Sequence, residues 1–493
     1  MDTRPIRFFH RGRIVELAGA RPTRSVLDWL REDQRATGTK EGCAEGDCGA
    51  CTVVLGELDE AGALRLRSAN ACIQLLPMLD GKALFTVEDL APVPGPLHPV
   101  QQALVDHHGS QCGFCTPGFV MSLWACRERH LAAGTTPTRE QLADELAGNL
   151  CRCTGYRPIL DAAQSLFAPG ATRVRVDPAP VEEALRTLAA DAALADDGRV
   201  QVPRTLDELA TLRAERPQAR LVAGATDVGL WINKQLRELP ELILTGRVDA
   251  LRRIEVHDGA LHVGAAVPLE DAWKALVDRW PALHDLWIRF ASPPVRHAGT
   301  LGGNLANGSP IGDSAPVLMA LDARLVLQRR EFTRELPLSD FYTGYQRNRL
   351  EPGEFLRQIV VPLPRPGIAV RAYKNSKRFA SDISALCAAY AIGLDDAGRV
   401  HHARLAYGGM AATVRRAAAA EASLLGRAWD EAALAAATQA LAQDFQPIDD
   451  LRASAGYRQQ MAAALLRRCW LETRAAGALP AQALSVWARG EPA

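Results

Sequence analysis

The stretch that decides the fold is residues 38–52, which read GTKEGCAEGDCGACT. Its cysteines, Cys43, Cys48 and Cys51, have the spacing C-x4-C-x2-C, and Cys72 is the candidate for a fourth ligand. This is the plant-type arrangement for a [2Fe–2S] cluster. The loop is rich in glycine, which suits a backbone that wraps closely around a small anionic cluster with its amides turned inward. The pattern therefore predicts an iron–sulfur site.

Zinc is the alternative metal for this loop. Zinc sites usually pair their cysteines as two C-x2-C knuckles, and an x4 arm in a glycine-rich loop is unusual for them. The flanking sequence also fits the iron–sulfur interpretation. Alternating apolar residues predict strands at Ile6–Phe9 and Thr52–Leu55, and Ser25–Arg31 is typical of a short helix.

A second cysteine group has the pattern C-x2-C…C-x-C, in QCGFCTPG at 111–118 and NLCRCTGY at 149–156. Apolar residues at three- and four-residue spacing predict helices around it, at His98–His107, Gly118–Ala132, Arg139–Leu146 and Ile159–Phe167. Thr138 and Gln141 form a candidate capping box. Zinc remains possible on spacing alone, but a neighbouring ferredoxin pattern favours a second [2Fe–2S] cluster. Cys126 lies on an apolar helix face and is interpreted as a core residue.

Two glycine turns further along indicate a nucleotide site. They are LVAGATDVG at 221–229 and AGTLGGNLANGSPIGD at 298–313. Small residues let backbone amides approach a pyrophosphate, and the side chains that can donate hydrogen bonds to it are Thr226, Thr300, Asn304 and Ser309. Either loop alone would also fit an ordinary turn. No G-x-G-x-x-G follows a strand in this region, which disfavours a Rossmann fold.

The composition limits the remaining possibilities. A length of 493 residues predicts three or four domains. Lys+Arg and Asp+Glu are equal at 57 each, so no basic surface for nucleic acid is indicated. The N-terminus has no apolar signal-peptide core and no apolar run is long enough to span a membrane. We therefore expect a cytoplasmic protein, where eleven cysteines point to metal or redox chemistry rather than disulfides.

The ferredoxin loop, the helical cysteine region and their order resemble the iron–sulfur half of the molybdenum hydroxylases, the family of xanthine dehydrogenase and aldehyde oxidase. Over nearly its whole length the chain is similar to the small iron–sulfur/FAD subunit of bacterial xanthine dehydrogenases. The resemblance implies a multidomain α+β fold. The expected parts are a plant-type [2Fe–2S] ferredoxin-like domain (1–89), a four-helix-bundle [2Fe–2S] domain (90–168), a linker (169–197), a vanillyl-alcohol-oxidase-type (PCMH) FAD domain (198–368) and a CO-dehydrogenase-flavoprotein-like C-terminal domain (369–493).

The resemblance also implies which residues form the sites. The metal ligands would be Cys43, Cys48, Cys51 and Cys72 for one cluster, and Cys112, Cys115, Cys151 and Cys153 for the other. The FAD contacts would be Leu221, Val222, Ala223, Gly224, Ala225, Thr226, Asp227, Val228, Phe290, Thr300, Leu301, Gly302, Gly303, Asn304, Asp313, Leu356 and Lys374. Tyr345, Arg378 and Asp382 would lie on the NAD side of the flavin. In the last domain, strands are expected at Leu386–Leu394 and Ala403–Ala406, and helices at Ala412–Ala442 and Ala453–Arg474.

The function implied by the resemblance is electron transfer. The chain ends at residue 493 with no room for molybdopterin domains, so we expect a molybdopterin-binding large subunit as partner in an α2β2 heterotetramer. Electrons from purine (hypoxanthine or xanthine) hydroxylation would pass to the helical-domain cluster, the ferredoxin cluster, FAD and then NAD+. Two alternatives stay open. The partner could act on an aldehyde, an N-heterocycle or carbon monoxide, or the chain could be a non-catalytic zinc-binding scaffold.

Overall fold

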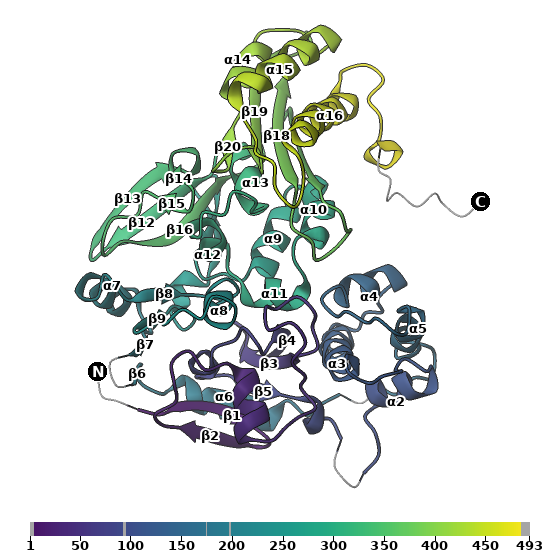
Figure 1. Cartoon of the computed structure of the whole chain (residues 1–493), viewed down its shortest axis with the longest axis vertical. Coiled ribbons are helices and arrows are strands. Elements are labelled where there is room, and N and C mark those ends of the chain that lie inside the picture. Colours follow the sequence, from purple (N-terminus) through teal and green to yellow (C-terminus); the bar gives the residue numbers. More distant parts are fainter. Residues whose placement is uncertain (1–3, 92–94, 174, 197–198, 485–493) are drawn as a thin grey trace. The chain divides into compact units, whose positions relative to one another are not determined.

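The computed structural model describes residues 4–91, 95–173, 175–196 and 199–484. Internal contacts divide the chain into two compact units. Figure 1 labels their helices and strands. The first unit consists of Met1–Ala250, Pro268–Glu270 and Ala291–Thr300. The second unit consists of Leu251–Val267, Asp271–Phe290 and Leu301–Ala493.

The first unit begins with a five-stranded sheet in the order β2-β1-β5-β3-β4, in which β1 and β5 run parallel and the other pairs antiparallel. Its strands are β1 (Ile6–His10), β2 (Arg13–Leu17), β3 (Thr52–Leu58), β4 (Leu64–Asn70) and β5 (Ala83–Phe85). The strands predicted at Ile6–Phe9 and Thr52–Leu55 are thus confirmed. The predicted short helix forms α1 (Val26–Asp28) and the π-helical turn η1 (Trp29–Asp33), and Ser25 and Asp28 form a capping box at its start.

Four helices follow the sheet in the same unit: α2 (Pro99–Asp106), α3 (Thr116–Ala133), α4 (Arg139–Glu145) and α5 (Arg157–Ser165). All four were predicted from apolar spacing, and the capping box between Thr138 and Gln141 is confirmed. Helix α3 is the centre of this part, because residues 118–128 are all buried. Trp124 of α3 packs edge-on against Phe85 of the sheet, with ring centroids 5.2 Å apart. The helices and the sheet therefore share a core.

The rest of the first unit is a small α/β part with a four-stranded sheet in the order β6-β7-β9-β8. Its elements are α6 (Ala179–Ala189), β6 (Leu194–Asp196), β7 (Val200–Val202), α7 (Leu206–Glu215), β8 (Arg220–Val222), α8 (Val228–Asn233), β9 (Leu242–Leu244) and α11 (Pro293–Ala298). Apolar side chains of this sheet, such as Leu194 and Leu242, belong to the same buried cluster as Phe8 and Trp29 of the first sheet. Helix α6 lies in the range expected as a linker.

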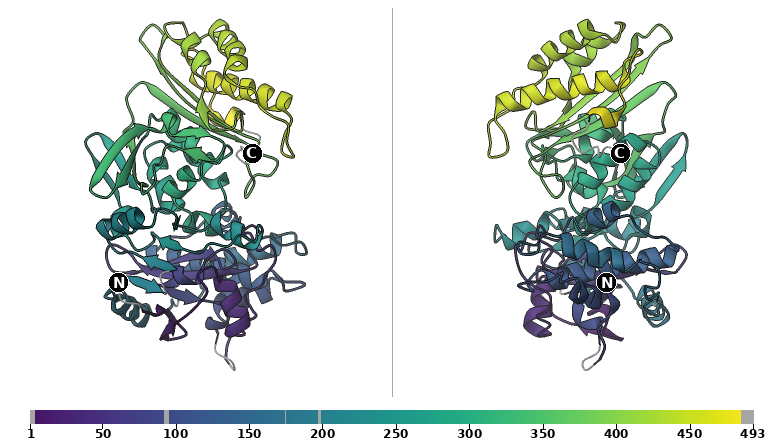
Figure 2. Two further views of the ribbon diagram at one scale, coloured as in Figure 1. Left: turned by 60° about the vertical axis from the view of Figure 1, so that its left-hand side comes forward. Right: turned by 90° about the vertical axis from the view of Figure 1, so that its right-hand side faces the viewer.

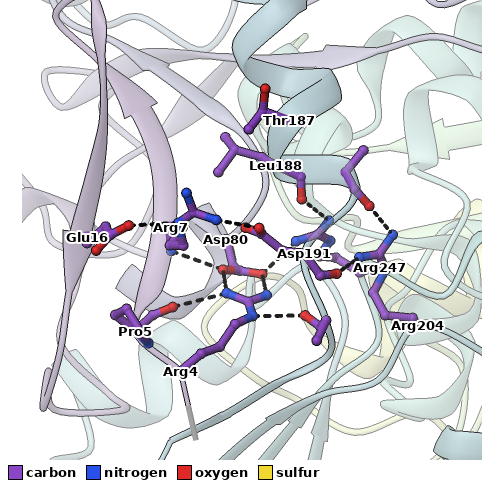
Figure 3. A network of polar contacts seen from close by, with 12 residues as sticks. Arg4, Pro5, Arg7, Glu16, Asp80, Thr187, Leu188, Asp191, Arg204 and Arg247 are labelled. Atoms are coloured by element: carbon purple, nitrogen blue, oxygen red, sulfur yellow. Dashed lines mark hydrogen bonds and ion pairs between the residues drawn. The ribbon is translucent and has the colours of Figure 1, made fainter. Parts of the chain in front are cut away.

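A polar network also joins the two sheets of the first unit (Figure 3). The Asp80 carboxylate accepts two hydrogen bonds from Arg4 and one from Arg247, each at 2.7 Å. It also accepts the backbone amide of Arg7 at 3.1 Å. Burial raises the pKa of Asp80, but the hydrogen bonds and charges of Arg4 and Arg247 outweigh it and lower that pKa overall. Asp80 therefore stays ionised and ties the N-terminal strands to the segment after β9.

The second unit has three antiparallel sheets, ordered β10-β11-β16-β12-β13, β14-β15 and β17-β18-β19-β20. The strands are β10 (Ile254–His257), β11 (Ala260–Gly264), β12 (Arg324–Arg329), β13 (Phe332–Pro337), β14 (Tyr342–Gly344), β15 (Arg347–Asn348), β16 (Phe355–Pro362), β17 (Ile368–Asn375), β18 (Leu386–Leu394), β19 (Val400–Gly408) and β20 (Arg415–Arg416). The helices are α9 (Leu269–Val277), which begins in the first unit, α10 (His284–Arg289), α12 (Leu301–Ala306), α13 (Ser314–Ala320), α14 (Ala418–Leu424), α15 (Glu431–Asp444) and α16 (Ala455–Thr473).

Strand β18 is buried on both faces, which explains its continuous apolar sequence. Alternate residues such as Leu386 and Tyr390 pack with apolar side chains of α14–α16. Figure 2 shows the ribbons of these helices beside the strands of the sheet. The strands and helices predicted for this domain are confirmed as β18, β19 and α14–α16. Among the described residues, no helix is both long and apolar enough to cross a bilayer.

Candidate cluster and flavin sites

The first cysteine set is brought together by the loop before β3 and by the end of β4. Cys43, Cys48 and Cys51 lie in that loop, and Cys72 follows β4 by two residues. The thiol of Cys43 lies within hydrogen-bonding distance of the thiols of Cys48 and Cys72, and Cys51 contacts Cys72 in the same way. The structure thus gathers the four side chains that the sequence indicated.

Backbone amides face this group and favour a negative charge on it. The amide of Cys48 donates to the Cys43 sulfur at 3.3 Å, and the amide of Glu45 donates to it at 3.5 Å. Hydrogen bonds from the thiols of Cys48 and Cys72 lower the pKa of Cys43. Gly42 allows the close approach of the loop, since a Cβ there would lie 2.7 Å from the Cys48 sulfur.

The second cysteine set lies at helix ends. Cys112 and Cys115 precede α3, while Cys151 and Cys153 lie between α4 and α5. The thiols of Cys115 and Cys151 are within hydrogen-bonding distance, as are those of Cys112 and Cys153. Cys151 is buried, whereas Cys112 and Cys153 are exposed.

Thr154 supplies polar hydrogens to the buried end of this set. Its hydroxyl donates to the Cys151 sulfur at 3.1 Å and its amide donates at 3.4 Å. Burial raises the pKa of Cys151, but these hydrogen bonds outweigh it and lower that pKa overall. Cys115 occupies the N-cap of α3, where the partial positive charge of the helix end also favours an anion.

Each set supplies the four thiols that a [2Fe–2S] cluster takes. Within the described ranges, no three or more His, Cys, Asp or Glu side chains have the arrangement of a single-ion site. In the first set Cys43 approaches both Cys48 and Cys72, and Cys51 approaches Cys72. In the second set Cys115 approaches Cys151, and Cys112 approaches Cys153. A [2Fe–2S] cluster takes four cysteines, two on each iron. The inward amides supply the hydrogen bonds that its negative charge requires.

In the first unit, the predicted flavin residues 221–228 span the end of β8, a tight turn and the start of α8, as the sequence indicated. Ala225 has a positive φ of 58° in this turn. A Cβ on Gly224 would lie 2.0 Å from the carbonyl oxygen of Ala298, so this glycine lets the backbone after α11 approach the turn. Thr226 lies at the same contact, with its hydroxyl 3.3 Å from the Cβ position of Gly299. Thr300 pairs with Pro268 in an isolated bridge of this unit.

In the second unit, residues 301–304 form the first turn of α12. Leu301 and Gly302 are buried, and a Cβ on Gly302 would lie 2.5 Å from the Cβ of Ala265. Gly303, in contrast, is exposed. Of the other predicted contacts, Leu356 is buried on β16, and Phe290 ends α10, where its ring lies 5.9 Å from that of Trp273.

Asp313 and Lys374 form a buried ion pair in the second unit. The Lys374 Nζ lies 2.6 Å from Asp313 Oδ2, and both side chains are 2% exposed. Ser384 completes the group, because its hydroxyl donates to Asp313 Oδ1 at 2.6 Å and accepts from Lys374 at 2.8 Å. The resemblance indicated Asp313 and Lys374 but not Ser384 as a flavin contact, and the structure shows that the three residues act as one unit.

The residues expected on the NAD side lie on exposed segments of the second unit. The Arg378 guanidinium, 55% exposed, donates to the Ser381 carbonyl at 2.8 Å and lies 3.9 Å from Asp382. Tyr345 is 62% exposed on the β14–β15 hairpin. Arg289, which the sequence did not single out, holds this loop by donating to the carbonyl of Phe379 at 3.2 Å.

Four family models match the chain in order along its length. They are the 2Fe-2S iron-sulfur cluster binding domain at residues 8–75, the [2Fe-2S] binding domain at 86–164, the FAD binding domain in molybdopterin dehydrogenase at 196–364 and the CO dehydrogenase flavoprotein C-terminal domain at 371–473. Each cysteine set therefore falls within one matched cluster-binding domain, and both glycine turns fall within the matched FAD domain.

Individual proteins are similar over different parts of the chain. A xanthine dehydrogenase of Emericella nidulans is 34% identical over 502 residues, which cover 89% of this chain and 36% of that protein. This chain thus spans about a third of the length of the curated relatives that it matches. A carbon monoxide dehydrogenase structure from Hydrogenophaga pseudoflava is 29% identical with a TM-score of 0.52, covering 55% of this chain and 94% of that one. A quinoline 2-oxidoreductase structure from Pseudomonas putida 86 is 25% identical with a TM-score of 0.52, covering 57% of this chain and 98% of that one.

These findings place the chain in the molybdenum hydroxylase family. It contains two [2Fe–2S] domains, a FAD-binding domain and a flavoprotein C-terminal domain, which together make up the iron–sulfur and FAD-binding part of proteins of this family. The predicted multidomain fold and the family resemblance are confirmed. The xanthine dehydrogenases that match are longer, fused chains.

Proposed function

We propose that this chain is the electron-transfer part of a NAD-linked xanthine dehydrogenase of purine catabolism. It would act in the cytoplasm with a molybdopterin-binding large subunit, as an α2β2 heterotetramer. One observation carries the proposal: the similarity to a xanthine dehydrogenase runs through both cluster domains and the flavin domains, whereas the carbon monoxide and quinoline enzymes match little more than half of the chain.

The eight paired cysteines would hold the two clusters, and the turns at 221–228 and 300–304 would bind FAD. When bound, the clusters carry single electrons and the flavin collects two, which it can release as hydride to NAD+. The part of this chain is to position these groups and to set the charge around them. Inward amides at Cys43 and the Thr154 hydroxyl at Cys151 supply hydrogen bonds of the kind that tune a cluster.

A second candidate keeps the same modules with another reducing substrate. The likeness to a carbon monoxide dehydrogenase and a quinoline oxidoreductase supports it, because nearly the whole of each of those matched chains corresponds to more than half of this one. The substrate pocket would lie on the partner, so the test is to purify the complex and compare xanthine with an aldehyde and quinoline as reductants. Cluster bleaching by quinoline or aldehyde but not by xanthine would favour this second candidate.

Metal analysis tests the cluster assignment. We expect about four iron atoms and about four acid-labile sulfides per chain, as two [2Fe–2S] clusters require. Changing Cys115→Ser should remove about half of the iron and about half of the acid-labile sulfide, because one of the two clusters is lost. Cys126→Ala is the matched control, since this thiol is buried within α3 and belongs to neither set. Stoichiometric zinc without labile sulfide would instead support the zinc scaffold.

The NAD assignment predicts that NADH reduces the flavin in the intact complex. Arg378→Ala should lower NADH-to-dye turnover about tenfold, the equivalent of about 1.4 kcal/mol for one charge-assisted contact. Reduction of the clusters by the partner's substrate should be unchanged. Arg399→Ala, at another exposed arginine of the second unit, is the control.

If Arg378 and Asp382 are only a surface pair, worth at most about 1 kcal/mol of stability, turnover will not change. If NADH never reduces the flavin of the parent, the acceptor is not NAD.

A further inference from the structure

Asn149 lies at the contact between the two cysteine sets. It is 2% exposed, and its side-chain amide donates to the carbonyl of Gly49 and to the hydroxyl of Thr52, both at 3.1 Å. Its side-chain oxygen accepts from the Ser122 hydroxyl at 2.6 Å. Gly49 lies in the first cluster loop, Ser122 lies in α3, and Asn149 precedes the C-x-C of the second set. One buried side chain thus joins all three segments.

The backbones of the two loops are also in direct contact at this point. The amide of Leu150 donates to the carbonyl of Cys48 at 3.0 Å. Cys48 belongs to the first set, and Leu150 is bonded to Cys151 of the second. The two sets are therefore connected by a short covalent path that contains a single hydrogen bond.

Glycines make this approach possible. Gly49 has a φ of +70°, and a Cβ there would lie 2.1 Å from the carbonyl oxygen of Gly148. A Cβ on Gly118, in the first turn of α3, would lie 2.2 Å from the carbonyl oxygen of Gly49. Neither distance leaves room for a side chain, so the loops meet main chain to main chain, and Asn149 fills the space beside them.

A second asparagine makes the equivalent contact on the other side of the first cysteine set. Asn233, the last residue of α8, donates to the carbonyl of Cys72 at 2.8 Å and to that of Ala44 at 3.0 Å. Helix α8 follows the turn at 221–228 directly, and a Cβ on Gly229 would lie 2.8 Å from the Cβ of Ile73. The predicted flavin turn is thus held against the first cluster loop.

We propose that Asn149 and Asn233 are positioning residues that fix the electron carriers in series. Asn149 sets the spacing between the two clusters, and Asn233 sets the spacing between the ferredoxin cluster and the flavin turn. The inference rests on the proposed function, since it needs carriers at these sites. Both residues act through carbonyl groups of the cluster loops, so their effect is on geometry rather than on the ligands themselves.

The test uses the purified complex, reduced stepwise with dithionite so that no substrate has to be known; the flavin signal is recorded at partial reduction and the interaction between the clusters at full reduction. Electron paramagnetic resonance then measures the magnetic interaction between the two reduced clusters and the relaxation of the one-electron flavin signal by the nearby cluster. In Asn149→Ala, the interaction between the clusters should shrink, while the flavin relaxation stays as in the parent. In Asn233→Ala, the flavin relaxation should slow and the interaction between the clusters should persist.

Rates provide a second measurement. After flash photoreduction, redistribution of an electron between the clusters should slow in Asn149→Ala, because the rate of electron transfer falls steeply as the distance between two carriers grows. Ser122→Ala removes one hydrogen bond of Asn149 and should give an intermediate effect. This milder variant keeps the test informative if Asn149→Ala fails to fold.

Arg247→Met is the matched control for general loosening. It breaks the Asp80 network, which joins the two sheets of the first unit, and it changes no residue of either cluster loop. Unchanged magnetic interactions in this variant, with altered ones in the asparagine variants, would support the proposal. Equal effects in all variants, or none in Asn149→Ala and Asn233→Ala, would overturn it. A parent that lacks two reduced-cluster signals would contradict the proposed function instead.

Discussion

Replacing Lys374 with methionine is expected to lower the free energy of unfolding by about 3–5 kcal/mol, because it leaves one partner of a buried ion pair without its counter-charge. The Asp313 carboxylate is 2% exposed, and its two contacts in this group are Lys374 at 2.6 Å and Ser384 at 2.6 Å. The remaining hydroxyl of Ser384 cannot neutralise the charge. Urea unfolding followed by tryptophan fluorescence and circular dichroism measures the loss, with Lys377→Met as the control at an exposed lysine.

A double variant separates the structural role of this pair from its predicted flavin contact. Lys374→Met with Asp313→Leu removes both charges, and replacement of a buried pair by apolar side chains is often neutral or stabilising. We expect stability to return towards that of the parent. If Asp313 and Lys374 also contact FAD, the double variant will be stable but low in flavin. A stable double variant with full FAD would contradict the flavin contact and leave a purely structural pair.

The cysteine sets could be predicted because their signal is local in the sequence. C-x4-C-x2-C and C-x2-C…C-x-C are short spacings set by the size of a cluster, and glycines at positions such as Gly42 reinforce them. The helices around the second set were predicted for a similar reason, since apolar residues at three- and four-residue spacing mark the buried face. The structure adds which thiols approach one another and which amides face them.

The positioning contacts could not be predicted, because they join residues far apart in the chain. Asn149 is visible in the NLCRC sequence, but its partner Gly49 lies 100 residues earlier. Asn233 lies 161 residues after Cys72. Ser384 was equally hidden, since a serine in a polar loop gives no sign that it will be buried against Asp313. An asparagine in a helix or loop is most often a solvated residue. Only their contacts with carbonyl groups of the first cluster loop distinguish Asn149 and Asn233.

Helix α6 shows a signal that the expected linker left out. The range 169–197, which is rich in Ala, Pro and Asp, was expected as a linker. Within it, Val181, Leu185 and Leu188 recur at helical spacing, and all three are buried. Gly224 is a related case. It is predicted to lie against the FAD pyrophosphate, and a Cβ there would also meet the Ala298 carbonyl oxygen, so this position has a packing requirement that the sequence did not indicate.

Changing Gly303→Val is expected to remove most of the bound FAD while leaving both clusters and the stability of the second unit intact. Gly303 is exposed at the start of α12, so a side chain there projects away from the core. If the amides of this turn approach the pyrophosphate, a branched side chain will occupy the space that the phosphates need. Flavin content per chain, measured after release in acid, reports the loss, and iron content shows that the clusters remain.

Gly302→Ala is the matched control for the neighbouring position, and it separates packing from ligand binding. A Cβ there would lie 2.5 Å from the Cβ and 2.6 Å from the carbonyl oxygen of Ala265, so α12 must shift away from the residue after β11. Overpacking of this kind typically lowers stability by about 1–3 kcal/mol. We therefore expect Gly302→Ala to lower both the unfolding midpoint and the flavin content, whereas Gly303→Val lowers only the flavin content. Full flavin occupancy in Gly303→Val would show that FAD does not lie against this turn, and equal loss of stability in both variants would show that Gly303 is a packing residue.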